Sequence, residues 1–191
     1  STSTTSPRLS STAIDPLPPL PPHLWLHVDA AYAGCACICP EFRWMLEGVS
    51  RADSLCFNPH KWLLTSFDCS AFWTRDRASL LGALSVTPEY LRTAHAGQVI
   101  DYRDWQIPLG RRFRALKLWF VIRAYGVEGI RRMIAAHIAL AAELDRWIAA
   151  APDFELLAPR SLALLNLRYR PAGMTDGPEL DGLNERLPER L

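Results

Sequence analysis

Two short apolar runs joined by one connection constrain the fold of this 191-residue sequence more than any other feature. The first covers residues 24–29 and ends on the carboxylate of Asp29, and the second covers residues 54–58. Short runs that are apolar throughout are typical of strands buried in a parallel sheet. Parallel neighbours need a crossover of about a dozen residues or more, and residues 40–49 suit a short helix there. A third run at residues 69–74 has the same character, so we predict an α/β fold.

The segments around these runs divide the chain into three predicted parts. Residues 1–22 are rich in Ser, Thr and Pro, which predicts a loop or an extended linker. Residues 23–110 are expected to form one α/β unit that carries the candidate binding site. Within it, residues 87–108 lack a clear period, which is typical of a functional loop such as an active-site lid. Residues 111–191 are expected to form connecting helices and the beginning of a smaller domain.

Apolar residues recur at helical spacing in the third part. They predict helices over residues 111–125 and 129–150, with Gly126 where the first helix stops. Two strands and a final helix are expected after them, at residues 154–157, 162–168 and 181–191.

The composition argues against several classes of partner. Lys and Arg number 21 against 20 Asp and Glu, a formal net charge of +1, so no long-range field attracts phosphate backbones or acidic lipid. Charged residues interrupt every apolar stretch before the roughly 20 residues that a bilayer span needs. The first 22 residues show no basic region followed by an apolar one, as a secretory signal would. We therefore expect a cytoplasmic protein that binds neither nucleic acid nor membrane.

Three of the five cysteines alternate along the chain, at Cys35, Cys37 and Cys39. On a strand this spacing would place their side chains on one face. Zinc sites use CxxC pairs, and no second pair of ligands accompanies these residues. We therefore expect no metal, and interpret the cysteines as small buried apolar residues.

An acidic and a basic residue follow the first two predicted strands. Asp29 ends the first strand, and Lys61 lies just beyond the second. Ligands collect at the carboxyl ends of strands in an open parallel sheet. Pyridoxal phosphate requires such a pair, because a lysine amine forms a Schiff base with its aldehyde while a carboxylate keeps its ring nitrogen protonated. Taken alone, the lysine is more often a solvated surface residue and the aspartate a turn or cap residue.

Four motifs, in order, resemble those of the group II pyridoxal-phosphate-dependent decarboxylases, and above all the aromatic-L-amino-acid decarboxylases, which include tyrosine, tryptophan and DOPA enzymes. They are HVDAAYAG at residues 27–34, NPHKW at 58–62, FDCS at 67–70 and WQIPLGRRFR at 105–114. The resemblance begins at about Ser10. It implies part of a fold-type I, aspartate aminotransferase-like protein, made of the back half of the large domain and the start of the small C-terminal domain.

The resemblance also implies roles for individual residues. Lys61 would be the Schiff-base lysine, and Asp29 the partner of the pyridine nitrogen. Ala31 would contact the face of the cofactor ring. His60 and Asn58 would contact the cofactor phosphate, and a hydrogen-bonded core histidine is the alternative for His60.

Three further residues bear on the reaction. Tyr90 takes the place of the loop tyrosine that is thought to protonate Cα after carbon dioxide leaves, and its alternative is an exposed loop aromatic. Gly110 favours an aromatic substrate, because histidine decarboxylases of this group tend to carry Ser there. His27 lies on the same strand face as Asp29, where it could help to orient the site or have only a structural role.

The resemblance implies decarboxylation of an aromatic L-amino acid to the arylalkylamine by a homodimer. The alternatives are an aromatic aldehyde synthase, which differs chiefly at the loop tyrosine, and a non-catalytic truncated remnant. Residues 7–10 depart from the family's Gly-Thr-Thr-Ser, and the family's long N-terminal part, which supplies the substrate pocket, is absent. We therefore expect a fragment of a longer enzyme that is inactive by itself.

Overall fold

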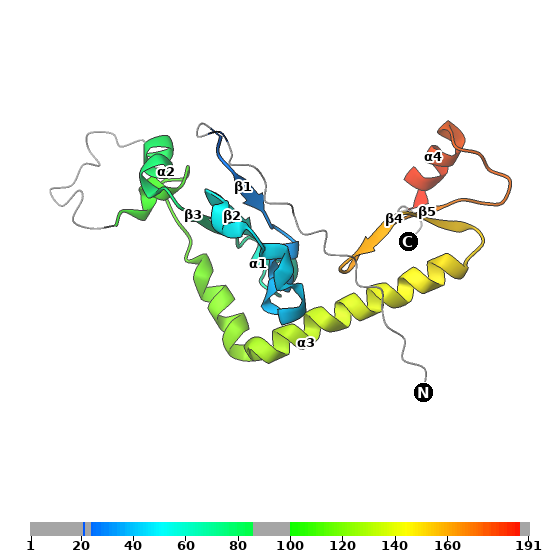
Figure 1. Ribbon diagram of the computed structural model, residues 1–191, viewed down its shortest axis with the longest axis horizontal. Coiled ribbons are helices and arrows are strands. Elements are labelled where there is room, and N and C mark those ends of the chain that lie inside the picture. The colour runs from blue at the N-terminus through cyan, green and yellow to red at the C-terminus, as the bar shows by residue number, and fades with distance from the viewer. Residues whose placement is uncertain (1–20, 22–23, 86–99, 188–191) are drawn as a thin grey trace.

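The long helix α3 (Arg114–Ala150) organises the computed structural model, which describes residues 21, 24–85 and 100–187. A three-stranded sheet with its connections contacts the middle of α3, and a two-stranded sheet contacts the end of this helix (Figure 1). The described part of the chain therefore has two sheets joined by one helix. Most of the site residues predicted from the sequence lie on or beside the first sheet.

The first sheet has the order β1-β2-β3, with β1 at His27–Asp29, β2 at Ser54–Phe57 and β3 at Ala71–Thr74. β1 and β2 are parallel, as predicted, and their register pairs Asp29 with Cys56. β3 is antiparallel to β2, so the prediction of a third parallel strand is wrong. Between β2 and β3 lie only the one-turn helix α1 (Pro59–Trp62) and a loop, which return the chain beside β2 in the opposite direction.

Short 3₁₀ helices connect β1 to β2, at Ala33–Ile38 (η1), Pro40–Leu46 (η2) and Val49–Arg51 (η3). The crossover predicted at residues 40–49 is therefore helical, although in 3₁₀ form. The alternating cysteines lie on and after η1, so the expectation that they share one face of a strand is wrong. Cys35 and Cys39 are nevertheless buried, as members of the apolar core that also contains Ile130 and Ile134.

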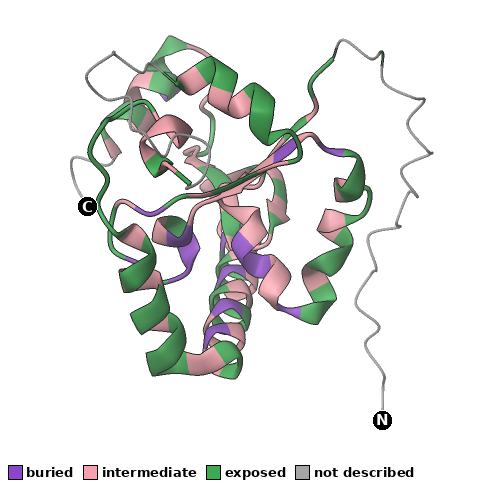
Figure 2. Cartoon of the chain, turned by 90° about the vertical axis from the view of Figure 1, so that its left-hand side faces the viewer, coloured by how far each residue is buried: buried purple, intermediate pink, exposed green. Residues whose placement is uncertain are grey.

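The main core lies where η1 and α1 meet the second half of α3. Ile130 and Ile134 are 1% and 0% exposed. They belong to one apolar cluster with Cys35, Cys39 and Trp62. Figure 2 shows that buried residues are few and that most of the described chain is intermediate or exposed. This packing anchors the segment that carries Lys61 to α3.

α3 is interrupted at Gly126, where the sequence predicted that a helix would end. The backbone there has φ 65° and ψ 172°, a conformation that residues with a Cβ rarely adopt. The predicted break is confirmed, but the helix resumes at once and no loop separates its two halves. The glycine therefore sets the sharp turn of α3 seen in Figure 1.

The second sheet is an antiparallel hairpin of β4 (Phe154–Ser161) and β5 (Leu164–Tyr169), followed by α4 (Pro178–Glu185). Both strands and the final helix were predicted, although α4 begins before residue 181. Two helices of the described residues were missed, the one-turn α1 and α2 (Arg77–Leu84). The second starts with an Asp76 cap whose carboxylate accepts the Ser79 N–H. Of the predicted loop at residues 87–108, the described part contains the 3₁₀ helix η5 (Tyr102–Trp105).

The first half of α3 exposes several large apolar side chains. They include Leu116, Trp119, Phe120, Ile122 and Tyr125. An apolar face of this extent normally packs against further protein. No helix within the described residues is long and apolar enough to cross a bilayer.

Candidate functional site

Backbone hydrogen bonds continue to connect the two chain segments just beyond the ends of β1 and β2. The backbone N–H of Ala30 donates to the carbonyl of Cys56 at 3.0 Å, and the N–H of Asn58 donates to the carbonyl of Ala31 at 3.0 Å. Because the strands are parallel, their carboxyl ends meet at the same edge of the sheet. The structure thus brings together Asp29, Ala31 and Asn58, as the sequence predicted.

Asp29 is an exposed carboxylate whose charge is stabilised locally. Its Oδ1 accepts the Ala31 N–H at 2.9 Å and lies 3.6 Å from the Cys56 thiol. These two hydrogen bonds, the first being the larger cause, lower the pKa of Asp29 and outweigh the opposing effect of burial, and the charges of Lys61 and His27 make smaller contributions that also lower it. Asp29 is therefore ionised at neutral pH, and it is close enough to Lys61 for the two charges to interact.

Lys61 lies on the one-turn helix α1, and its side chain is exposed. The next residue, Trp62, is buried and stacks on Tyr32 with ring centroids 4.5 Å apart. The indole N–H of Trp62 donates to Nδ1 of His137 on α3 at 3.0 Å. Trp62 thus anchors α1 to the core and leaves the Lys61 amine accessible to a ligand.

His60 and Asn58 are both held by residues that precede β3. Nδ1 of His60 lies 3.0 Å from the backbone nitrogen and 2.7 Å from the backbone oxygen of Cys69. It can therefore accept when unprotonated and donate when protonated, so the ring keeps a partner in either state. Oδ1 of Asn58 accepts the Ser70 hydroxyl at 2.7 Å. The assignment of both side chains to a phosphate site stays a prediction.

The remaining predicted residues lie apart from this group or outside the described residues. Nδ1 of His27 lies 2.7 Å from the Ser54 hydroxyl, which also accepts the Trp25 indole N–H at 2.7 Å, an arrangement that supports a structural role. Gly110 is exposed, and its carbonyl accepts from the Gln106 amide at 3.3 Å. Tyr90 lies outside the described residues, so its role stays a prediction.

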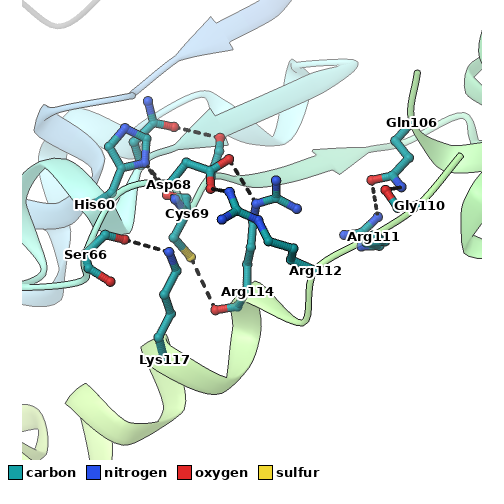
Figure 3. A network of polar contacts seen from close by, with 12 residues as sticks. His60, Ser66, Asp68, Cys69, Gln106, Gly110, Arg111, Arg112, Arg114 and Lys117 are labelled. Carbon is teal, nitrogen blue, oxygen red and sulfur yellow. Dashed lines mark hydrogen bonds and ion pairs between the residues drawn. The ribbon is translucent and has the colours of Figure 1, made fainter. Parts of the chain in front are cut away.

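Sequence reasoning missed an ion cluster beside the site, formed by Asp68, Arg112 and Arg114 (Figure 3). Arg112 lies 2.5 Å from one oxygen of Asp68 and Arg114 lies 3.0 Å from the other. The cluster joins two of the motifs quoted above, FDCS and WQIPLGRRFR. Opposite charges in both motifs were visible in the sequence, but nothing in it paired residues so far apart.

Gly34 gives a test of how closely η1 must approach the end of β2. A Cβ at Gly34 would lie 2.8 Å from Cβ of Phe57 and 3.0 Å from Cβ of Ala30. Gly34→Ala should therefore lower the free energy of unfolding by about 1–3 kcal/mol, measured by denaturant unfolding. Gly82→Ala is the control, because its Cβ would meet no described atom within 4 Å and should be neutral or stabilise α2 by up to about 1 kcal/mol. Equal effects of the two changes would contradict the close approach at Gly34.

The site combines an ionised carboxylate, an accessible amine and side chains that donate hydrogen bonds. Among the described residues, no group of His, Cys, Asp or Glu is arranged to hold a metal ion. The arrangement suits a small anionic ligand that reacts with an amine and carries a basic ring nitrogen for the carboxylate.

Comparisons with known proteins agree with this chemistry. The profile of the family described as "Pyridoxal-dependent decarboxylase conserved domain" matches residues 15–170. The chain is 47% identical to tyrosine decarboxylase 4 of Petroselinum crispum, covering 95% of this chain and 38% of the relative. It is 52% identical to phenylacetaldehyde synthase of Arabidopsis thaliana, covering 85% of this chain and 34% of the relative.

A solved structure shows the same fold. The crystal structure of Oryza sativa TDC with pyridoxal phosphate and tryptamine matches with a TM-score of 0.77 at 44% identity, covering 88% of this chain and 35% of that one. The chain thus has part of an α/β, fold-type I architecture, as predicted. It spans about a third of the length of the relatives that it matches.

Proposed function

The chain belongs to the pyridoxal-dependent decarboxylase family, and we propose that it forms the lysine-bearing part of an enzyme that removes carbon dioxide from an aromatic L-amino acid to give the arylalkylamine. One observation carries this proposal: Asp29 and Lys61 follow neighbouring parallel strands, with Asp29 ionised and Lys61 near enough for its charge to act on Asp29. A carboxylate and an amine in this arrangement are what pyridoxal phosphate requires of a protein.

The residues present fit the cofactor. Lys61 offers an exposed amine to the aldehyde, and Asp29 offers an ionised carboxylate to the ring nitrogen. Ala31, joined to Asn58 through the backbone, would lie against the ring, while Asn58 and His60 would bind the phosphate. When bound, pyridoxal phosphate supplies an electron-accepting ring that stabilises negative charge at Cα after carbon dioxide leaves.

Each side chain then has a distinct task. The Lys61 amine would hold the cofactor covalently. Asp29 would keep a proton on the ring nitrogen, because a carboxylate with a lowered pKa stabilises the adjacent positive charge. Tyr90, which lies outside the described residues, would deliver a proton to Cα.

The class of substrate follows from the relatives. Their names refer to tyrosine and phenylacetaldehyde, and the solved structure contains tryptamine. Gly110 is consistent with an aromatic substrate for this chain. We further propose that the complete enzyme is a cytoplasmic homodimer, and the exposed apolar face on the first half of α3 supports an extensive contact with further protein.

The proposal is tested with the complete enzyme and pyridoxal phosphate. L-tyrosine, L-tryptophan and L-DOPA are supplied separately, and the amine and carbon dioxide are quantified. Equal amounts of both products from at least one of these substrates are expected. The absence of both products from an enzyme that binds the cofactor would contradict the decarboxylase assignment and support a non-catalytic remnant.

The similarity to phenylacetaldehyde synthase supports a second candidate, an aldehyde-forming enzyme. The two reactions separate after loss of carbon dioxide, when Cα either takes up a proton to give the amine or reacts with dioxygen to give the aldehyde, ammonia and peroxide. Tyr90 favours the first outcome, because a phenol placed near Cα could deliver that proton.

Tyr90→Phe should therefore keep cofactor binding and carbon dioxide release while shifting product from amine to aldehyde. The measurement is the ratio of amine to aldehyde, with peroxide followed in parallel. Tyr102→Phe, which changes another tyrosine of the predicted loop at residues 87–108, on η5, is the matched control and should leave the ratio unchanged. An unchanged ratio in Tyr90→Phe would show that another group protonates Cα.

A further inference from the structure

The two side chains proposed to bind the phosphate are held by consecutive residues. The Cys69 backbone lies within hydrogen-bond distance of Nδ1 of His60, and the Ser70 hydroxyl donates to Asn58. In addition, the backbone N–H of His60 donates to the Cys69 carbonyl at 3.3 Å. The orientation of both side chains thus depends on where the chain places residues 69 and 70.

The residue before them, Asp68, is bound to a distant part of the chain. Its two carboxylate oxygens have separate partners, Arg112 at 2.5 Å and Arg114 at 3.0 Å, at the start of α3 (Figure 3). Burial raises the pKa of Asp68, but its backbone hydrogen bond and the two arginines outweigh this and hold the pKa below its usual range. Asp68 is therefore ionised at neutral pH, and both pairs are ionic.

Neighbouring contacts strengthen the same attachment. The Cys69 thiol lies 3.8 Å from the carbonyl of Arg114, and Nζ of Lys117 donates to the carbonyl of Ser66 at 2.7 Å. Hydrogen bonds and ion pairs therefore attach the segment at residues 66–70 to the start of α3. The ion pairs of Asp68 lie between the other two contacts.

We infer that Asp68 is a positioning residue for the cofactor site, which, through Cys69 and Ser70, fixes His60 and Asn58 in the orientation that binds phosphate. The inference rests on the proposed function. Asp68 itself bonds to arginines and not to the ligand, so its effect is indirect. Binding groups that are already held in place lose less conformational entropy when the ligand binds, so the affinity for the ligand is higher.

The alternative is that the ion pairs only support the fold. The Asp68 side chain is 31% exposed and that of Arg112 is 73% exposed, and pairs at such positions often contribute little to stability. The chain offers a matched comparison in Glu155 of β4, a carboxylate that also pairs with two arginines, Arg168 and Arg170, and is 29% exposed. Glu155 lies in the second sheet, and its arginine partners, Arg168 and Arg170, are on and just after β5.

The test measures the dissociation constant of pyridoxal phosphate in the complete enzyme, together with the melting temperature and kcat at saturating cofactor. Asp68→Asn should raise this constant about tenfold, the lower end of the loss seen when outer partners of metal ligands are removed. kcat at saturating cofactor should stay near the wild-type value. Glu155→Gln should leave the constant unchanged, and Arg112→Gln should raise it less than Asp68→Asn does.

A dissociation constant for Asp68→Asn equal to that of the wild type, or raised equally by Glu155→Gln, would overturn the inference. If Asp68→Asn does not fold, the dissociation constant measured for Arg112→Gln is the deciding result. The Arg112 side chain is exposed, so it can be changed without disturbing the core. A raised constant then supports the positioning role and an unchanged one refutes it. Binding and turnover of the wild type are measured first, so failure of the proposed function appears there, whereas failure of this inference appears only in the variants.

Discussion

Lys61→Ala in the complete enzyme is expected to abolish turnover and the visible absorbance of the covalently held cofactor together. The methyl group of alanine cannot bond to the aldehyde, and the chain has only one other lysine, Lys117. Nζ of Lys117 is occupied by the carbonyl of Ser66 at 2.7 Å, so it is not placed to substitute. Turnover and the absorption spectrum of the purified protein with pyridoxal phosphate measure both effects.

Two further substitutions test whether the primary amine of Lys61, and not only its positive charge, is required. Lys61→Arg keeps a positive charge near Asp29 but removes the primary amine, so it should be as inactive as Lys61→Ala. Lys117→Arg removes the other amine and keeps a donor for the carbonyl of Ser66, so it should retain activity. Measurable turnover by Lys61→Arg would contradict a covalent role for Lys61.

Asp29→Asn is expected to leave the cofactor bound while lowering turnover by about 10²- to 10⁴-fold. The amide keeps the size of the carboxylate, and its oxygen can still accept the Ala31 N–H, which is bonded at 2.9 Å in the native protein. A neutral group cannot, however, hold the ring nitrogen protonated. Cofactor affinity and kcat, measured separately, should therefore diverge.

Asp53→Asn is the matched control for this change. The Asp53 carboxylate also accepts a backbone N–H, that of Leu26 at 2.8 Å, but at the opposite end of the paired strands. This variant should keep its turnover. A near-normal rate for Asp29→Asn, or an equal loss in both variants, would remove Asp29 from its proposed role.

The parts of the fold that local sequence determines were predicted well. The short apolar runs identified β1 and β2, and the distance between them required a crossover, which the structure supplies as 3₁₀ helices. Gly126 marked the break in α3, because its positive φ is a local requirement that favours glycine. These features depend on a few adjacent residues and therefore appear in their pattern.

Features that depend on distant residues were not predictable in the same way. The apolar run of β3 does not reveal its direction, which is set by the short return through α1. The alternation of Cys35, Cys37 and Cys39 fits a strand as well as a helical turn, and packing against α3 selects the turn. Tertiary contacts decided both cases.

The same division applies to the site. Asp29 and Lys61 were predicted as site residues because both follow predicted strands and fall in motifs, and the structure places them after neighbouring parallel strands. The cluster of Asp68, Arg112 and Arg114 was missed, since only the folded chain brings these residues together. Supporting residues of this kind carry no pattern of their own in a single sequence.

The measurement that tests the central claim most directly is the position of the covalent bond to the cofactor. Borohydride reduction of the complete enzyme with pyridoxal phosphate fixes that bond, and mass spectrometry of the digested protein locates it. We predict that the reduced cofactor is attached to Lys61, in the peptide that contains Asn58 to Trp62. Attachment to Lys117 or to a lysine outside this chain, with Lys61 unmodified, would contradict the account.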